Sequence, residues 1–468
     1  MKRIRASIGA LVVALALVAL GAAADKPEWG LIEKTPGMFD GFTLFAPNGY
    51  TTVYLINADG KVVHTWGNGL KPGISVYLLE DGRLLRAIHR DDNTVFGKPP
   101  FGGGRVQILG WDGKVEWDYR MSDDLRYQHH DIRPMPNGNV LLLVWEFKTE
   151  DEAIAAGRDP FLLSQGKLFP ETIVEVKPTG PTSGDIVWEW KLWDHLIQDH
   201  DGSKANYGVV SEHPERLDVN YILSPGADWN HSNGIDYNAE LDQIVISMRS
   251  MDEIYVIDHS TTTEEARGHT GGKQGKGGDF LYRWGNPRAY ERGAAEDQRL
   301  FKQHNPHWIA PGLPGAGNIL VFNNGNDRPG GNHSSVDEIV PPVSADGRYE
   351  ELRDERANGP AEPLWSYKSD PTEDFYSHFI SGAQRLPNGN TLICSGAQSM
   401  FFEVTPKKKV VWRYRAAFGR PDAPKSSGGM LEDGAQPPDA GATAMRGIGV
   451  FRAVRYSKDY PGLAGKGL

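Results

Sequence analysis

The sequence is poor in cysteine and in net positive charge. Its single cysteine, Cys394, excludes a disulfide within the chain, so a folded state must be stabilised by its core. Because Cys394 lies in an apolar stretch, we predict a small buried side chain rather than a nucleophile. The 50 Lys and Arg residues face 61 Asp and Glu, a formal net charge of −11. DNA and RNA need a basic surface for their phosphates, so we expect no nucleic-acid partner.

Long apolar runs are also scarce. The one clear run, Ile8–Leu20, follows Lys2, Arg3 and Arg5 and precedes "GAAAD". This order is typical of a secretory signal peptide, with cleavage expected after Ala24. A retained anchor is the alternative, although the run is short for a membrane span. We therefore expect a signal peptide at 1–24 and a periplasmic or secreted domain at 25–468, without stable membrane insertion.

Several catalytic motifs are missing. The chain has no Gly-x-x-x-x-Gly-Lys-Ser/Thr loop, so a nucleotide-phosphate cradle is unsupported. It has no Gly-x-Ser-x-Gly nucleophile elbow and no His-x-x-x-His pair on a helix. We accordingly expect no cofactor and no dedicated metal motif. Histidines brought together from distant parts of the chain could still bind a metal, so a metal-dependent hydrolase stays open.

The chain is instead rich in repeated β-hairpins. A strand, a tight turn and a second strand ending in an aromatic residue recur six times, as in "TVYLINADGKVVHTW", "RVQILGWDGKVEWDY" and "MFFEVTPKKKVVWRY". The Asp-Gly pairs supply the positive φ of a hairpin turn. Between these outer hairpins lie inner ones, such as "HHDIRPMPNGNVLLLVW" and "HFISGAQRLPNGNTLIC". Both contain Pro-Asn-Gly-Asn, with a histidine upstream and an apolar strand downstream.

Six pairs of inner and outer hairpins predict an all-β fold, a six-bladed β-propeller. The first outer hairpin lies at the N-terminus and its inner partner at the C-terminus, so both ends should share one blade and close the ring. The Pro-Asn-Gly-Asn turns should join the two innermost strands of their blades. The 192–227 segment interrupts the repeat and is expected to carry a short helix.

Equivalent repeat positions of a propeller lie around one axis. Histidines occupy the blade-start position in four repeats, and an arginine follows an inner strand in "FNNGNDR". We expect these residues to converge on a central channel: His130, His231, His304 or His307, His378 and Arg328. Such a cluster suits a tetrahedral anion. The alternative for each imidazole is a structural hydrogen bond to a neighbouring blade.

Five residues are candidates for substrate binding. In "DWNHSN", Trp229 could stack on an aromatic substrate and Asn233 could orient the ring of His231. His130 and His307 are assigned to the same role, as is Asn324, which lies in the segment that carries Arg328.

These motifs resemble the bacterial aryl-sulfate sulfotransferase (arylsulfotransferase) family. The resemblance rests on "DWNHSNGIDY", "QHNPHW…GNILVFNNGNDR" and "FRAVRYSKDYPGL" and covers the mature chain. It implies an exported six-bladed propeller that moves a sulfuryl group between phenols through a sulfated histidine. It also implies that His231, His304 and Arg328 surround that group. The family's nucleophilic histidine is expected near Ser395–Val404, which here contains none, so His378 is the nearest candidate.

The working hypothesis has His378 as nucleophile, His231 and His304 as acid/base and oxyanion donors, and Arg328 as clamp. Its substrates would be a small aryl sulfate donor and a phenolic acceptor. The rival from another class is a non-catalytic propeller that binds an anionic or aromatic ligand. A homodimer is left open.

Overall fold

The computed structural model describes residues 28–90, 92–97, 102–224, 226–350, 356–416 and 449–468. Regular structure there is almost entirely β-strand, and the two α-helices, α1 (Glu150–Ala155) and α2 (Thr263–Ala266), are short. The expected signal peptide lies outside the described residues. Of the helices that are described, none is long and apolar enough to span a bilayer.

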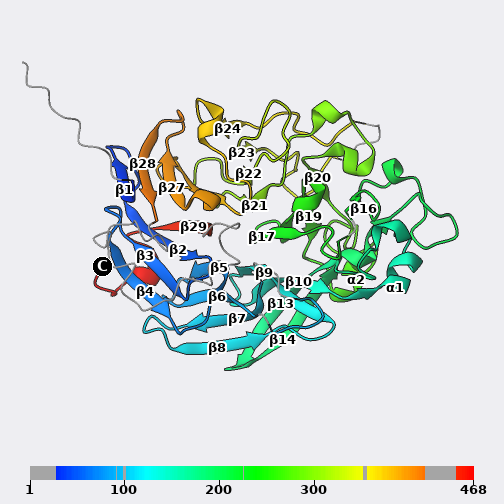
Figure 1. Cartoon of the computed structure of the whole chain (residues 1–468), viewed down its shortest axis with the longest axis horizontal. Helices are drawn as coiled ribbons and strands as arrows, with labels where there is room; N and C mark the ends of the chain where they lie inside the picture. Colours follow the sequence, from blue (N-terminus) through cyan, green and yellow to red (C-terminus); the bar gives the residue numbers. More distant parts are fainter. Residues whose placement is uncertain (1–27, 91, 98–101, 225, 351–355, 417–448) are drawn as a thin grey trace, which may run out of the picture.

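Six antiparallel sheets stand around a common axis as the blades of a propeller (Figure 1). From the innermost strand outward, blades 1 to 3 are β29 (Val450–Ser457), β2 (Gly41–Pro47), β3 (Thr52–Ile56), β4 (Val62–Gly67); β5 (Pro72–Leu78), β6 (Leu84–His89), β7 (Gly104–Leu109), β8 (Val115–Arg120); and β9 (Arg126–Pro134), β10 (Val140–Glu146), β13 (Glu171–Gly180), β14 (Ser183–Lys191). Blades 4 to 6 are β17 (Ser232–Asn238), β18 (Gln243–Met248), β19 (Glu253–Asp258), β20 (Tyr282–Trp284); β21 (His304–Trp308), β22 (Ile319–Asn323), β23 (Ser335–Ile339), β24 (Trp365–Tyr367); and β25 (Gly382–Arg385), β26 (Thr391–Ser395), β27 (Met400–Val404), β28 (Val410–Arg415), β1 (Gly30–Lys34). The innermost strands contact one another in a complete circle, which confirms the predicted six-bladed architecture.

The two ends of the chain close the ring, as predicted. β29 pairs with β2 in blade 1, with Gly41 opposite Ser457, and β1 adds a fifth strand to blade 6. One detail differs from the prediction, because the inner hairpin of blade 1 is split between the ends. The C-terminal segment supplies only β29, and the N-terminal segment supplies β2.

Tight glycine turns set the register of the hairpins. The two Pro-Asn-Gly-Asn turns join β9 to β10 and β25 to β26, the innermost pairs of blades 3 and 6, as predicted. Gly138 and Gly389 adopt φ of 84° and 85° in these turns, a region that glycine enters without steric cost. In the β3–β4 turn Gly60 has φ 74°, and a Cβ there would lie 2.8 Å from the Tyr414 ring.

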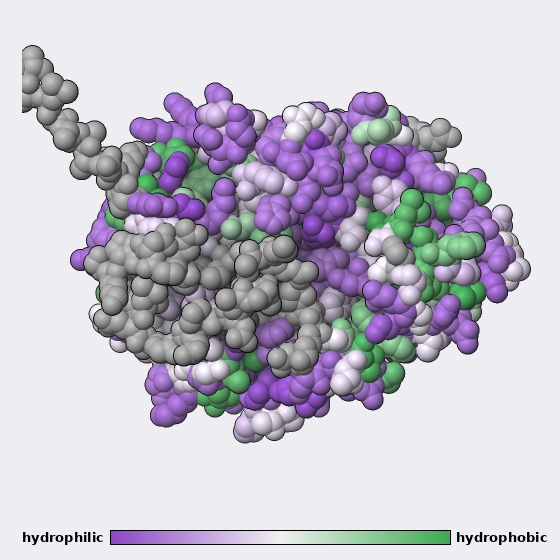
Figure 2. Space-filling view, in the orientation of Figure 1, coloured by the Kyte–Doolittle hydropathy of each residue, from purple (hydrophilic) through white to green (hydrophobic). Residues whose placement is uncertain are grey.

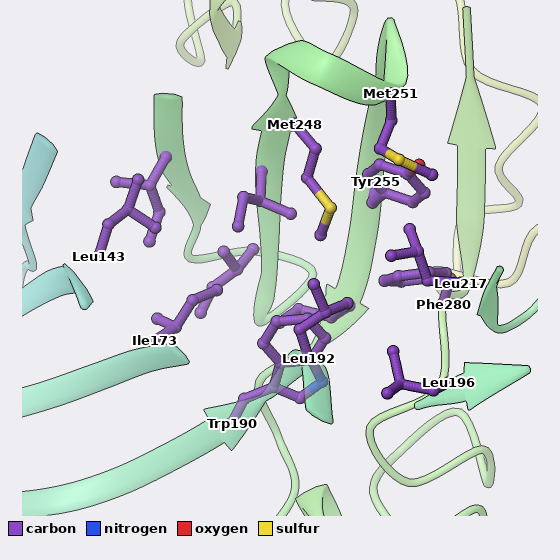
Figure 3. Close-up of a cluster of buried hydrophobic side chains, with 14 of the residues drawn as sticks. Leu143, Ile173, Trp190, Leu192, Leu196, Leu217, Met248, Met251, Tyr255 and Phe280 are labelled. Carbon is purple, nitrogen blue, oxygen red and sulfur yellow. The ribbon is translucent and has the colours of Figure 1, made fainter. Parts of the chain in front are cut away.

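The hydrophobic core lies between neighbouring blades. Figure 3 shows the cluster in which Leu143 and Ile173 of blade 3 face Met248 and Tyr255 of blade 4. The outer-strand tryptophans Trp188, Trp190 and Trp412 are buried, and Cys394 is buried in blade 6, as predicted. Burial raises the pKa of its thiol, which agrees with a structural role.

In the described residues of the 192–227 insert, the expected short helix is not an α-helix. The insert forms two single 3₁₀ turns and a short parallel pair, β15 (Leu196–Ile197) with β16 (Leu217–Asp218). Proline and aspartate interrupt it often, which prevents the apolar periodicity that a helix needs. Figure 2 shows hydrophobic surface on the side of the molecule where Figure 1 places α1 and β16.

A buried ion pair ties four blades together at the axis. Asp131 of β9 accepts hydrogen bonds from Arg452 Nη2 of β29 (2.9 Å), Ser75 Oγ of β5 (2.6 Å) and the Ile235 amide of β17 (3.2 Å). Arg452 also donates to the Tyr77 hydroxyl at 2.7 Å. Side chains therefore occupy the axis at this level, and the candidate site lies beside it.

Candidate functional site

Irregularities at the start of the innermost strands turn side chains toward the axis. β5, β9, β17, β21 and β29 each have a register shift against the neighbouring strand near that end. Ile74, His231 and Ile380 also have positive φ, at 77°, 45° and 50°. A β-bulge re-aims a side chain that a regular strand would direct to a sheet face. Non-glycine residues with positive φ are uncommon, and they cluster at functional sites.

The result is an axial ring with one residue from each blade: Phe451, Ile74, His130, His231, His304 and Ile380. The ring centroids of His130 lie 5.8 Å from His231 and 5.3 Å from Phe451. His304 lies 6.4 Å from Phe451, while Ile74, Ile380 and Phe451 form one apolar cluster. The predicted convergence of His130, His231 and His304 is therefore seen, on one half of a ring whose other half is apolar.

His231 is held by an acid that the sequence analysis did not single out. Its Nδ1 donates to Asp228 Oδ2 at 2.5 Å, and both side chains are half-buried. Burial alone would raise the pKa of Asp228, but the charges of His231, His129 and Arg249 hold it below its ordinary value. The carboxylate thus fixes the tautomer of His231 and leaves Nε2 for chemistry.

Both ring nitrogens of His304 are occupied. Asn324 Nδ2 donates to the Ser377 and Ile380 carbonyls. Its Oδ1 therefore faces His304 Nδ1 at 2.7 Å and accepts a hydrogen bond from it. His304 Nε2 then accepts from the Ile380 amide at 3.2 Å. Burial and Arg249 hold the pKa of His304 well below its ordinary value. His304 is thus a neutral side chain that connects blades 5 and 6. The side-chain amide of the buried Asn324 is fully hydrogen-bonded and cannot bind a substrate, which corrects the role predicted for Asn324.

Arg249 is a further cation close to the axial ring, and no sequence motif marked it. It follows β18, and its amide donates to the His231 carbonyl at 3.0 Å. Its half-buried guanidinium is close enough to Asp228, His304 and His378 to influence the pKa of each. A guanidinium in this place can clamp an anion. Its position after an inner strand, the same criterion that selected Arg328, could have identified it.

Arg328 lies elsewhere. Its Nη2 donates to Ser335 Oγ at 3.0 Å, its Nη1 lies 3.4 Å from His333 Nε2, and its guanidinium lies over the Phe301 ring. Burial lowers the pKa of Arg328, with Asp337 as the charge that opposes this. Within the described residues its contacts hold the loop that follows β22 and include no histidine of the axial ring.

His378 stands on the segment before β25 and is exposed. Its ring packs against Phe379, with centroids 4.6 Å apart, and lies 6.2 Å from Tyr376. Partial burial and the charge of Arg249 lower the pKa of His378, which favours the neutral imidazole. The structure thus brings His378 near Arg249 but does not place it in the axial ring.

Three other predicted substrate-binding residues face away from the ring. Trp229 is wholly buried in the core with Arg158 over its ring, so no face is free to stack on a substrate. Asn233 donates to the Gln303 carbonyl at 2.8 Å, so Asp228 orients His231 instead. His307 hydrogen-bonds the Asn305 carbonyl at 3.1 Å, and burial lowers the pKa of His307 to about 4. The predictions for Trp229 and Asn233 followed from proximity to His231 in the sequence, and that for His307 from its blade-start position. The bulged strand starts override both.

A family model described as arylsulfotransferase (ASST) matches residues 103–417, more than half of the chain. The chain belongs to the arylsulfotransferase family. It is 23% identical over 321 residues to the arylsulfate sulfotransferase AssT of Escherichia coli O6:H1 strain CFT073, a match that covers 62% of this chain and 49% of that protein. The chain thus spans about half the length of this curated relative.

Solved structures with a similar fold are distant in sequence. A Bacteroides caccae protein of unknown function matches with a TM-score of 0.42 and 12% identity, covering 80% of this chain and 93% of that one. The β-propeller domain of Cps50 (Swd1) from Myceliophteria thermophila matches with a TM-score of 0.40 and 10% identity, covering 83% and 90%.

The stretch where the arylsulfotransferase family's nucleophile was expected packs against the His378 segment. In blade 6, the Gly396 amide donates to Ser381 Oγ and the Ala397 amide to Ser377 Oγ, both at 3.0 Å. Residues 377–381 and 395–397 are therefore neighbours in space. His378 lies in the first of these segments, and the second contains no histidine.

Proposed function

We propose that this arylsulfotransferase transfers a sulfuryl group from a phenolic sulfate ester to a phenol beside the axial ring. The observation that carries the proposal is the Asp228–His231 pair with Arg249 next to it. This arrangement combines a proton carrier of fixed tautomer with a cation for the sulfuryl oxygens. Family membership supports the reaction type. The apolar half of the ring, with Phe451 and Ile74, offers a surface for an aryl group.

In the first half-reaction His378 attacks the sulfur. A neutral imidazole lone pair forms the N–S bond while the S–O bond to the phenol breaks, and the electron pair leaves on the phenol oxygen. Such a transition state is loose and spreads charge over the non-bridging oxygens, so catalysis depends on positioning and cationic stabilisation. Arg249 supplies that stabilisation.

His231 manages the proton. The leaving phenol has a pKa of about 10, so its oxygen leaves poorly unless it is protonated. The imidazolium of His231, stabilised by Asp228, donates that proton from Nε2. In the second half-reaction the neutral His231 accepts the proton of the incoming phenol. The phenol oxygen attacks the sulfur, the N–S bond breaks, and His378 is regenerated.

His304 and Arg328 take supporting parts in this proposal. His304 has no free nitrogen while it bridges Asn324 and Ile380, so it maintains the shape of the ring. Arg328 maintains the loop after β22. The clamp proposed from the resemblance is therefore reassigned to Arg249.

The test measures 4-nitrophenolate release from 4-nitrophenyl sulfate, with and without phenol. We expect release that depends on phenol. Arg249→Lys should lower kcat about 10²–10³-fold, as loss of a preorganised transition-state donor does. Arg328→Lys, the matched control, should keep wild-type kcat. His378→Ala should abolish turnover, and the wild type quenched during turnover should carry one SO₃ group on the peptide that contains His378.

Three outcomes contradict parts of the proposal. A loss of turnover in Arg328→Lys but not in Arg249→Lys would return the clamp to Arg328. Phenol-independent release would indicate hydrolysis instead of transfer. Saturable binding of the ester by folded protein, with no release across several acceptors, would favour the non-catalytic ligand-binding propeller.

A further inference from the structure

Three imidazoles lie close together at the axial ring, two from the ring itself and one beside it. One nitrogen from each of His129, His130 and His231 lies within 4.8 Å of the other two. The ring centroids of His129 lie 4.2 Å from His130 and 5.0 Å from His231. His129 and His130 are adjacent on β9, where the register shift lets both turn inward, and His231 comes from the next blade. The cluster therefore joins blades 3 and 4.

Two nitrogens of the cluster lack the partners that buried polar atoms normally have. His129 Nε2 and His130 Nδ1 are buried, and no other described residue is within hydrogen-bonding distance of them. Most buried polar atoms of proteins have a partner, so an unpaired one calls for a ligand, an ion or a water. Two such atoms in one cluster of three imidazoles indicate a missing electrophile that all three share.

Carboxylates stand behind two of the three rings. His129 Nδ1 donates to Glu171 Oε1 at 3.1 Å, and His231 Nδ1 donates to Asp228 Oδ2 at 2.5 Å. Each carboxylate fixes the proton on Nδ1 and presents Nε2 as a lone pair. A carboxylate–histidine pair of this kind is the usual support of an imidazole that ligates a metal.

The charge of the surroundings also favours a cation. Glu171 is fully buried, and its partner His129 stacks on Trp145 with ring centroids 4.0 Å apart. With neutral imidazoles, two carboxylates lie beside the cluster, the fully buried Glu171 and the half-buried Asp228, and Arg249 is a cation close to Asp228. A divalent ion at the three nitrogens would compensate both carboxylates and leave Arg249 for an exogenous anion.

We propose that His129, His130 and His231 form a binding site for a divalent transition metal, with Zn²⁺ as the best match. Three neutral nitrogen donors suit Zn²⁺ and its neighbours in the transition series and do not suit Ca²⁺ or Mg²⁺, which take oxygen ligands. A tetrahedral zinc with Zn–N of about 2.0–2.1 Å holds its nitrogens about 3.3 Å apart. Small ring rotations would close the cluster to that distance. His304 cannot supply a fourth ligand while both its nitrogens are engaged, so one position stays open.

This site does not depend on the proposed sulfuryl transfer, but the two share one atom. A bound ion occupies Nε2 of His231, the atom that would carry the proton. The metal-loaded protein should therefore be a poor transferase. Metal binding and transfer are two separable properties of the axial ring.

The experiment titrates Co²⁺ and Zn²⁺ into full-length, chelator-treated protein without substrate, by calorimetry, visible absorption and melting temperature. We expect one equivalent to bind, an intense visible Co²⁺ absorption typical of a four-coordinate tetrahedral site, and a higher melting temperature. His231→Gln should abolish the spectrum. Glu171→Gln, which keeps the volume of the side chain, should weaken binding about 10–100-fold.

The second histidine group of the described residues provides a matched control. His195, His269 and Asp279 also lie together, but both nitrogens of the buried His195 are hydrogen-bonded, to Asp279 and to the Ala266 carbonyl. His269→Ala should leave metal binding unchanged. Binding that survives His231→Gln but is lost in His269→Ala overturns the proposal, as does a wild type that binds well below one equivalent. Adding Zn²⁺ during the ester assay separates the properties: failure of transfer in the metal-free protein would contradict the proposed function and leave the metal site standing.

Discussion

Removal of the Asp131 carboxylate should destabilise the whole propeller, because this group connects four blades. Asp131 is fully buried and receives hydrogen bonds from Arg452, Ser75 and the Ile235 amide. Asp131→Ala leaves the Arg452 guanidinium buried without its counter-ion. Breaking a buried ion pair in this way costs about 3–5 kcal/mol. A domain of this size unfolds with an entropy of about 0.9 kcal/mol/K, at about 2.1 cal/mol/K per residue, so the melting temperature should fall by about 3–5 °C.

The double variant Asp131→Leu with Arg452→Met tests the reason for that loss. Replacing both charges of a buried pair by apolar groups of similar volume is often neutral or stabilising. The double variant should therefore melt above the Asp131→Ala single variant, although fewer hydrogen bonds remain. Differential scanning fluorimetry measures the melting temperature of each variant, and urea unfolding followed by tryptophan fluorescence measures its free energy of unfolding. If Asp131→Ala melts within about 1 °C of the wild type, or if the double variant melts below Asp131→Ala, the ion pair is not what holds the blades together.

Two predictions concern pH. Partial burial and Arg249 lower the pKa of His378, so the transfer rate should fall only when the pH drops below the usual histidine range. Arg249→Gln should move this fall in rate to higher pH. A pH–rate profile that does not move would show that His378 does not titrate in the reaction. His259 lies between Asp242 and Glu175, at 2.8 Å and 2.9 Å, and although burial alone would lower its pKa, the two carboxylates raise the pKa to about 9. Its stabilisation, about 3 kcal/mol, should be complete below about pH 6.5 and be lost as the pH rises through about 9, so the melting temperature of the wild type should fall over that window. His259→Gln should flatten that slope, and an unchanged slope would assign it to another group.

Much of the fold could be predicted because its signals are local. Alternating apolar residues and glycine turns define each hairpin within about 15 residues, and radial repetition then brings equivalent positions to one axis. That reasoning placed His130, His231 and His304 together. It could not find the Asp228 support of His231 or the charge of Arg249, because both depend on how a bulged strand start turns its side chains.

The errors share one cause. Trp229 and Asn233 flank His231 in sequence, and both were assigned to the site, yet one is core and the other bridges to Gln303. Residues two apart on a regular strand share a face, which would place Trp229 and Asn233 with His231, but β17 begins only at Ser232 and the positive φ of His231 breaks the alternation. A sequence pattern does not record that change.

The sequence by itself determined the class of fold, the closure of the ring by both chain ends and the family, since these follow from repeated short-range patterns and whole motifs. The tertiary structure alone decided which imidazole nitrogens are free. His304 has both nitrogens engaged by blades 5 and 6, whereas His129, His130 and His231 each have a nitrogen within 4.8 Å of the other two. The hydrogen-bond partners of His304 and His129 lie 20, 76 and 42 residues away in the sequence. Their geometry is fixed only when the blades pack, and that packing decides the chemistry available at the axis.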